Sequence, residues 1–185
     1  RSKAEDIRQF HHRALREALA EPRYSLLLQR FADWLERRAW REVCHDKQSE
    51  RLADPVRAFA TPLLERDHRR VVKQGDLFAE LSAEQRHRLR IRIKQLRYAQ
   101  DFFNSLYETA TVRRYLDALS KLQDCLGVMN DISVARRLLD EAGLRSVSAA
   151  RQVIEGWYGC RLDIHERQFA EVWQQFLACE RPWKV

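Results

Sequence analysis

The fold is decided by the stretch Ser82-Ala-Glu-Gln85-Arg-His87-Arg-Leu-Arg90-Ile-Arg-Ile-Lys94-Gln-Leu-Arg97-Tyr98. Ser82 followed by Gln85 is a capping box, in which each side chain accepts a hydrogen bond from the backbone N–H of the other residue. Apolar residues then recur at the three- and four-residue steps that place them on one side of a helix. We therefore expect a helix over residues 83–106.

Positive charge is concentrated in this same stretch. The chain of 185 residues carries 34 Lys and Arg against 27 Asp and Glu, a net charge of +7. Six of these cations stand between Gln85 and Gln100, and no acidic residue lies between the same limits. The rest of the chain is thus nearly neutral. Such concentration indicates that an anionic partner binds this segment, because uniform basicity would indicate little beyond solubility.

Four side chains of the expected helix share one sector. At about 100° per residue this sector is about 80° wide, and its members are His87, Arg90, Lys94 and Arg97. The apolar Leu89, Ile93 and Leu96 fall on another sector, which can face a core. We call the four residues the basic ridge, which is about 15 Å long at 1.5 Å per residue.

The charge pattern alone leaves two interpretations of the basic ridge open. Like charges at these spacings repel by roughly 0.2–0.5 kcal/mol per pair, so the ridge is costly unless something neutralises it. Asp101 falls on the same sector, four residues after Arg97, and can pair with that arginine. The ridge is therefore either a face that is solvated or paired within the fold, or a binding surface for an anion.

The remainder of the chain also indicates helices. Only five Gly and four Pro are present, which is too few turn-forming residues for a sandwich or barrel of many short strands. Apolar spacing predicts further helices at residues 4–20, 22–43, 55–75, 111–141 and 148–178. Within 111–141 we expect Thr111 to cap the helix, Gly127 to interrupt it and Asn130 or Asp131 to restart it, and we expect Gly143 to close it. The fold class is all-α, an antiparallel four-helix bundle from Asp54 onward with additional N-terminal helices.

The sequence offers little sign of a metal site or a membrane span. The four cysteines, Cys44, Cys125, Cys160 and Cys179, are widely spaced and form no C-x-x-C pair. Such spacing favours ordinary buried cysteines over zinc ligands or a disulfide framework. No run of about 18 uncharged apolar residues exists, so we expect no segment to cross a membrane.

Two stretches resemble a known family. They are His87-Arg-Leu-Arg90-Ile-Arg-Ile-Lys94-Gln-Leu-Arg97-Tyr98, followed by Phe102-Phe103, and Leu122-Gln123-Asp124-Cys-Leu126-Gly127-Val-Met-Asn130-Asp131. Both closely resemble successive signatures of the CHAD (conserved histidine α-helical domain) family, and residues 24–34 and Gly156-Trp157 fit it too. The first His-x-x-Arg-x-x-x-Arg signature of that family has no counterpart before His87. The chain therefore resembles the second half of the domain with the last helices of the first half.

This resemblance implies an all-helical domain that binds inorganic polyphosphate through a basic surface between two pseudo-symmetric bundles. It implies that residues 1–45 are an N-terminal helical pair from the first bundle, and that residues 46–185 are the four-helix bundle that carries the basic helix. It further implies a homodimer that completes the basic pore, a neighbouring CYTH-type domain, and a cytoplasmic location associated with polyphosphate granules.

By motif position, the resemblance assigns the four residues of the basic ridge to phosphate contact. A second basic cluster lies on the preceding helix and consists of His68, Arg69, Arg70 and Lys73. We assign Arg69 and Lys73 of this cluster to the site, although the cluster suits the dipole of a helix C-terminus nearly as well. Lys121 is a weaker candidate. We interpret Gln123, Asp124, Asn130 and Asp131 as structural, and Tyr98 and Trp157 as core residues.

Three other functions are weighed against polyphosphate binding. Sequence-independent nucleic-acid binding suits a basic helix, but the sequence shows no aromatic stacking pair next to the ridge. An enzyme of phosphoryl transfer needs placed carboxylates or a phosphate loop, and neither is evident, so we expect no catalysis and no cofactor. The third alternative is a scaffold whose ridge meets an acidic partner protein.

Overall fold

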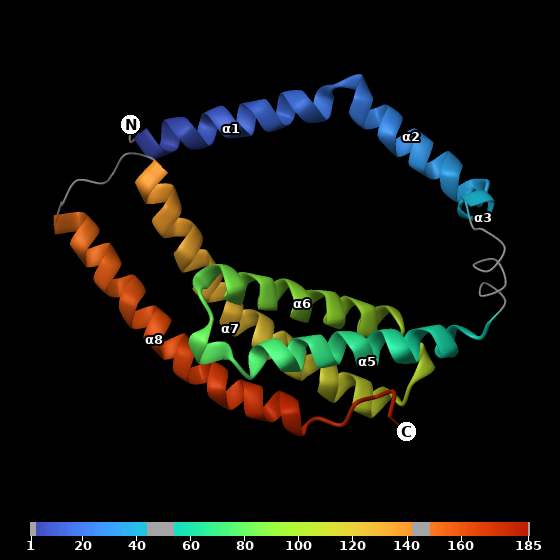
Figure 1. Ribbon diagram of the computed structural model, residues 1–185. Coiled ribbons are helices and arrows are strands. Elements are labelled where there is room, and N and C mark those ends of the chain that lie inside the picture. Colours follow the sequence, from blue (N-terminus) through green and yellow to red (C-terminus); the bar gives the residue numbers. More distant parts are fainter. Residues whose placement is uncertain (1–2, 44–53, 142–148, 185) are drawn as a thin grey trace. The chain divides into compact units, whose positions relative to one another are not determined.

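The structure is a computed structural model that describes residues 3–43, 54–141 and 149–184 (Figure 1). Every regular element in these ranges is helical, which confirms the predicted fold class. The chain divides into two compact units, Arg1–Pro55 and Val56–Val185, and each is described by itself.

The first unit contains helices α1 (Lys3–Ala20), α2 (Pro22–Glu36) and α3 (Trp40–Val43). Proline opens α2 because the first turn has no partner for the missing N–H. The prediction of one helix over residues 22–43 is wrong, since Arg38 adopts a φ of 53° and breaks it. A left-handed residue cannot continue a right-handed helix. Large apolar side chains of α1 and α2, among them Phe10, Leu27 and Phe31, are exposed within this unit.

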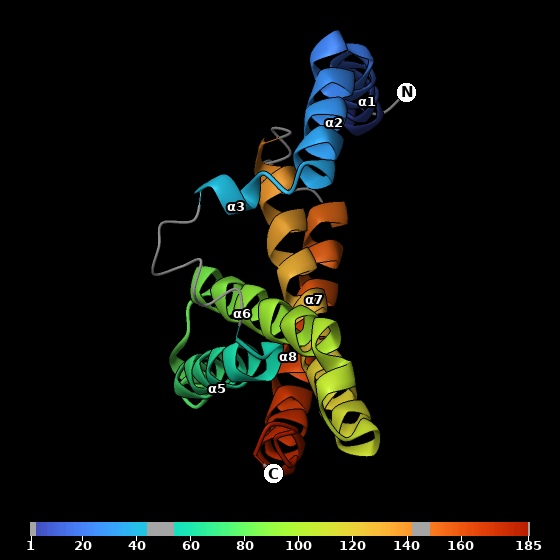
Figure 2. The same ribbon diagram turned by 90° about the vertical axis from the view of Figure 1, so that its right-hand side faces the viewer.

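The second unit is the predicted antiparallel four-helix bundle (Figure 1 and Figure 2). Its long helices are α5 (Val56–Gly75), α6 (Ala83–Phe102), α7 (Thr109–Glu141) and α8 (Ala149–Ala178). Two short 3₁₀ turns, η1 (Phe78–Glu80) and η2 (Asn104–Leu106), lie beside α6 in the chain. Helix α6 packs between α5 and α7, and α7 packs on α8. The last part of α7 and the first part of α8 extend beyond the two shorter helices.

One apolar core holds the bundle together. Each helix contributes fully or almost fully buried side chains, including Leu64 from α5, Ile93 from α6, Leu119 from α7 and Phe176 from α8. Burying one such side chain contributes roughly 1.5–3 kcal/mol. The three apolar residues expected on the core side of α6, Leu89, Ile93 and Leu96, are all buried. This packing fixes the rotation of α6 and points the basic ridge away from the core.

The local signals at both ends of the α5–α6 connection are confirmed. Helix α5 ends at Gly75, and the capping box of Ser82 and Gln85 is formed in both directions. Gly75 lies so close to Trp173 of α8 that a Cβ atom there would be 2.1 Å from the indole ring. The Nε1–H of that indole donates to the carboxylate of Asp76 at 3.1 Å. The turn after α5 is thereby fixed against α8.

Helix α7 differs from the prediction at two points. It runs unbroken from Thr109 to Glu141, so Gly127 does not interrupt it and Asn130 does not restart it. A glycine in a helix interior costs about 1 kcal/mol, which the burial of neighbours such as Leu126 exceeds. Thr111 is not the cap either, because Glu108 accepts hydrogen bonds from the N–H groups of the first turn. Gly143, expected to close this helix, lies outside the described residues.

Candidate anion-binding site

The basic ridge projects from the side of α6 that faces away from the core. His87 and Lys94 are exposed, and Arg90 and Arg97 are half-buried. Ser82 and Gln85 fix where the helix begins, and the buried apolar residues fix its rotation. The four cations therefore follow one another along a single helical surface, as the sequence period requires.

Carboxylates neutralise two of the three arginines of α6 that lie off the ridge, and none of those on it in the described ranges. Arg86 is bound by Glu166 of α8, and Arg88 by Glu84 one turn earlier on α6. Within the described part of the chain no ion pair joins a carboxylate to Arg90, Lys94 or Arg97. The pair expected between Asp101 and Arg97 is therefore not formed there. The ridge keeps its positive charge available for a ligand from outside.

The buried part of two ridge arginines reinforces this point. The Nε atoms of Arg90 and Arg97 are each inaccessible to solvent and have no hydrogen-bond partner among the described residues. An unsatisfied buried donor costs about 1–3 kcal/mol. The guanidinium planes are thus held against the protein surface by packing rather than by an acidic partner. Phosphate oxygens of a ligand would accept hydrogen bonds from the outer N–H groups of these guanidinium ions, which are already charged and oriented.

Helix α7 lies directly alongside the ridge, and two contacts fix its antiparallel register. The Nδ1–H of His87 donates to Oδ1 of Asn130 at 2.5 Å, because an amide oxygen only accepts. A Cβ atom at Gly127 would lie 4.0 Å from Nε of Arg90. Asn130 thus orients the histidine, a role that the interpretation as a helix cap did not foresee. Gly127 lies beside the arginine at a distance that would also accommodate a methyl group.

Tyr98 is exposed rather than buried, so its interpretation as a core residue is wrong. Its ring lies beneath two ridge cations, with Nζ of Lys94 at 5.5 Å and Cζ of Arg97 at 4.9 Å from the centroid. Such cation–π contacts contribute about 0.5–1 kcal/mol at exposed sites. The ring positions both cations on the surface. Trp157 is exposed too, at 57%, beneath the guanidinium of Arg161 on α8.

The second basic cluster does not join the ridge as a unit. His68, its first member, is buried, and its Nδ1 lies 2.7 Å from the hydroxyl of Tyr115. Burial, and then the nearby Arg181, lower the pKa of this histidine to about 4. Arg69 is exposed with Glu65 at 3.9 Å, and Lys73 is exposed. Neither Arg69 nor Lys73 has a hydrogen bond or ion pair to the ridge in the described ranges, so their part in the site stays a prediction.

Lys121 is exposed on α7. The register set by His87 with Asn130 and by Arg90 with Gly127 places it level with residues 96 and 97 of α6. It therefore lies near the C-terminal end of the ridge along the helix axis. Its phosphate contact remains a prediction, because no interaction joins its ammonium group to the ridge in the part of the chain that is described.

A hollow of about 350 Å³ opens where the ridge begins, between the first turns of α6 and the last third of α7. His87 and Asn130 line it together with Ser133 and Arg137. Sequence reasoning did not single out the last two residues. No local signal could have found them, because only the register of α7 on α6 brings them to His87. The hollow adjoins the N-terminal end of the ridge, and Ala83 and Val134 make part of its lining apolar.

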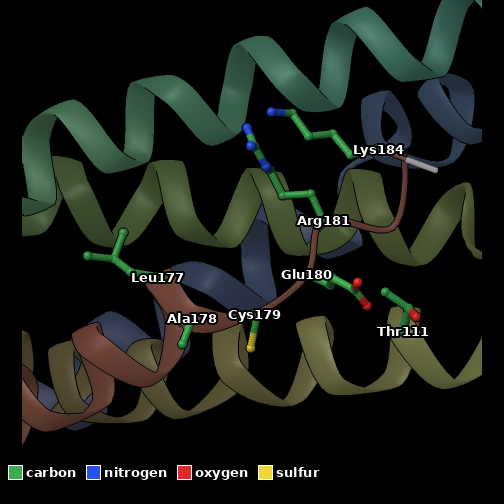
Figure 3. A pocket seen from close by; sticks show the side chains of 7 residues that line it. All are labelled: Thr111, Leu177, Ala178, Cys179, Glu180, Arg181 and Lys184. Atoms are coloured by element: carbon green, nitrogen blue, oxygen red, sulfur yellow. The ribbon is translucent and has the colours of Figure 1, made fainter.

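Another hollow, of about 400 Å³, lies at the end of α8 and is separate from the ridge (Figure 3). Arg181 and Lys184 extend toward α5, whereas Cys179 points toward α7, the helix that carries Thr111. The guanidinium of Arg181 already donates to both oxygens of Glu65, at 3.1 and 3.2 Å. Its charge is therefore compensated, unlike that of the ridge arginines.

The described ranges contain neither a cluster of metal-ligating side chains nor a helix that could span a membrane. No group of three His, Cys, Asp or Glu side chains there is arranged to hold a metal ion. Cys125 is buried as expected, whereas Cys160 is exposed, and Cys44 lies outside the described residues. None of the described helices combines the length and the apolar character needed to cross a bilayer.

A helical bundle with an uncompensated row of cations on one helix defines a class of protein, the small all-α domain with an anion-binding surface. The chain belongs to the CHAD domain family, whose model matches residues 1–140. This match includes the whole basic ridge and ends before Gly156. The family is known for polyphosphate binding, and its domains are generally non-catalytic binding modules. No curated protein shows a significant match to the chain.

Proposed function

We propose that this domain binds inorganic polyphosphate through the basic ridge and does not turn it over. One observation carries the proposal: Arg90, Lys94 and Arg97 have no carboxylate partner among the described residues, whereas Arg86 and Arg88 on the same helix both have one. Arg92, which is exposed on another side of α6, also lacks a carboxylate partner in the described ranges, but it is a single charge there. The ridge places three such cations on one surface, where one ligand can contact them together.

The chemistry of the ridge suits a linear phosphate polymer. Arginine offers a planar fork that grips two phosphate oxygens, and lysine acts as a point charge. Each charge-assisted hydrogen bond contributes about 1.5–3 kcal/mol before ordering costs are subtracted. The ridge is about 15 Å long, so its donors can follow several consecutive phosphates. Nothing in this recognition depends on a base or a sugar.

A binding role without catalysis agrees with the surroundings of the ridge. Phosphoryl transfer relies on carboxylates that hold Mg²⁺ beside the phosphates. The acidic residues of α6 are Glu84, which binds Arg88, and Asp101, which stands alone at the other end. The proposal further expects a cytoplasmic protein associated with polyphosphate granules, a second copy that completes the basic surface, and a CYTH-type neighbouring domain.

Isothermal titration with polyphosphate tests the proposal through two double variants of equal charge. Arg90→Ala/Lys94→Ala removes two ridge cations, while Arg88→Ala/Arg92→Ala removes two exposed cations from other sides of the same helix. The first variant should lose affinity and lower the slope of log K against log salt by roughly 0.7–0.9 per lost phosphate contact. The control should lose much less. Equal losses in both variants would show that total charge, and not the ridge, holds the ligand.

A further inference from the structure

An aromatic stripe runs beside the basic ridge on α6. Tyr98 is 51% exposed and Phe102 is 80% exposed, which makes Phe102 the most exposed large apolar side chain of the described chain. At about 100° per residue, the two rings fall within roughly 60° of His87, on the flank of the ridge. They are separated by one helical turn, about 6 Å along the axis. Two aromatic faces therefore follow the cations along one surface.

The two rings are held in place by neighbours and not by burial. Lys94 and Arg97 lie over Tyr98. Phe102 stands edge-on to the buried Phe103, with ring centroids 4.9 Å apart and planes at 88°. The ring of Phe102 is fixed at its base while most of its surface faces solvent. The lack of an aromatic stacking pair next to the ridge in the sequence counted against nucleic-acid binding. Tyr98 and Phe102 supply such a pair, so that argument no longer applies.

Exposed aromatic rings beside phosphate-binding cations suit a ligand that has both phosphates and rings. Polyphosphate has no ring, so it makes no use of Phe102. Single-stranded nucleic acid offers one base for each phosphate, and proteins bind it by combining a basic track with aromatic platforms. The bases of a duplex are stacked inside the helix and cannot reach such platforms. The chemistry of the surface therefore selects the single strand.

We propose that the basic ridge together with Tyr98 and Phe102 forms a binding site for single-stranded nucleic acid. Arg90, Lys94 and Arg97 contact its phosphates, and two neighbouring bases stack on the rings. Asp101 is the one exposed carboxylate beside Phe102 on α6, and it weakens binding at that end without blocking the rings. This function goes beyond polyphosphate binding, because the same cations serve both ligands and the rings serve one.

Fluorescence anisotropy with a labelled oligothymidylate of about 12 nucleotides tests the site, since single sites of this kind cover roughly 4–16 nucleotides. Tyr98→Ala/Phe102→Ala should weaken oligothymidylate binding by roughly tenfold for each lost stack. The single variant Phe102→Ala, which removes the ring that has no ridge cation over it in the described structure, should leave the affinity for polyphosphate, measured by titration calorimetry, unchanged. Tyr98→Phe keeps the ring and should keep the affinity. Circular dichroism confirms that each variant is folded.

The matched control is Trp157→Ala, which removes another exposed aromatic that has an arginine over its ring, but from α8. It should leave both affinities unchanged. The proposal is overturned if the Tyr98/Phe102 variant binds oligothymidylate as the wild type does, or if Phe102→Ala loses polyphosphate affinity to the same extent as oligothymidylate affinity. A duplex bound as tightly as the single strand also overturns it. Failure of the proposed function has a different signature, in which oligothymidylate binds and polyphosphate does not.

Discussion

Because His87 donates to Asn130 through Nδ1, phosphate binding by its other ring nitrogen depends on whether the imidazole is protonated. A neutral imidazole has one N–H, and Oδ1 of Asn130 engages it at Nδ1. The remaining nitrogen, Nε2, then carries a lone pair, which repels a phosphate oxygen. Protonation turns Nε2 into a donor. Polyphosphate binding through His87 should therefore take up a proton.

Proton uptake predicts that polyphosphate affinity rises as the pH falls. Calorimetry in buffers of different ionisation enthalpy measures the number of protons bound with the ligand. His87→Gln should abolish the uptake, whereas His12→Gln, which changes an exposed histidine of α1, should not. A wild-type titration with no proton uptake at any pH tested would remove His87 from the site.

At the scale of the single residue, the sequence predicted which side chains form the ridge but not how they are held. The period of a helix depends only on residues three and four apart, so the positions of Arg90 and Lys94 followed directly. The partners of the ridge come from elsewhere, since His87 and Asn130 are 43 residues apart in the chain. The exposure of Tyr98 likewise depends on which neighbours cover it.

At the scale of the element, replacing glycine by alanine should have opposite effects on stability at two positions, because their surroundings differ. Gly127 lies inside the continuous α7, and the nearest atom to a Cβ there would be 4.0 Å away. Gly127→Ala should therefore raise the free energy of unfolding by roughly 0.5–1 kcal/mol, because alanine is the better helix former. Gly75→Ala places a Cβ 2.1 Å from Trp173 and should lower it by about 1–3 kcal/mol or more.

Urea unfolding of the two glycine variants, with circular dichroism as the signal, measures both effects. The midpoint should shift in opposite directions for the same chemical change. A destabilised Gly127→Ala would mean that α7 is broken at this position after all. Polyphosphate affinity serves as the second readout, and Gly127→Ala should preserve it because the methyl group only touches Arg90.

The helices were largely predictable and their interruptions were not. The capping box at Ser82 and the end of α5 at Gly75 are local signals, and both were confirmed. Gly127 is also a local signal for a break, but burial of its neighbours in the bundle overrides it. Arg38 shows the opposite failure, because no residue type there announces the break between α2 and α3. Tertiary packing decides such cases, and one sequence does not display it.

At the scale of the whole molecule, the second unit depends on a buried histidine that joins three of its helices. His68 of α5 contacts the hydroxyl of Tyr115 on α7, and its ring lies 5.4 Å from that of Phe176 on α8. The sequence placed this residue in a basic surface cluster. The structure instead uses it as a neutral core residue, which makes the stability of the unit depend on pH.

Acid should therefore destabilise this unit before its carboxylates are protonated. Burial lowers the pKa of His68 from 6.5 to about 4. As the pH falls, the unfolded chain therefore binds a proton at this residue near pH 6.5, whereas the folded chain binds it only near pH 4. Stability is then fully present above pH 6.5 and declines as the pH falls toward 4. At 1.36 kcal/mol per unit, the total loss is about 3 kcal/mol. Urea unfolding at pH 7 and pH 5 measures about 2 kcal/mol of this loss, with His68→Gln as the variant and His12→Gln as the control. Only His68→Gln should flatten the dependence, and a wild type equally stable at both values would contradict the neutral, buried state of His68.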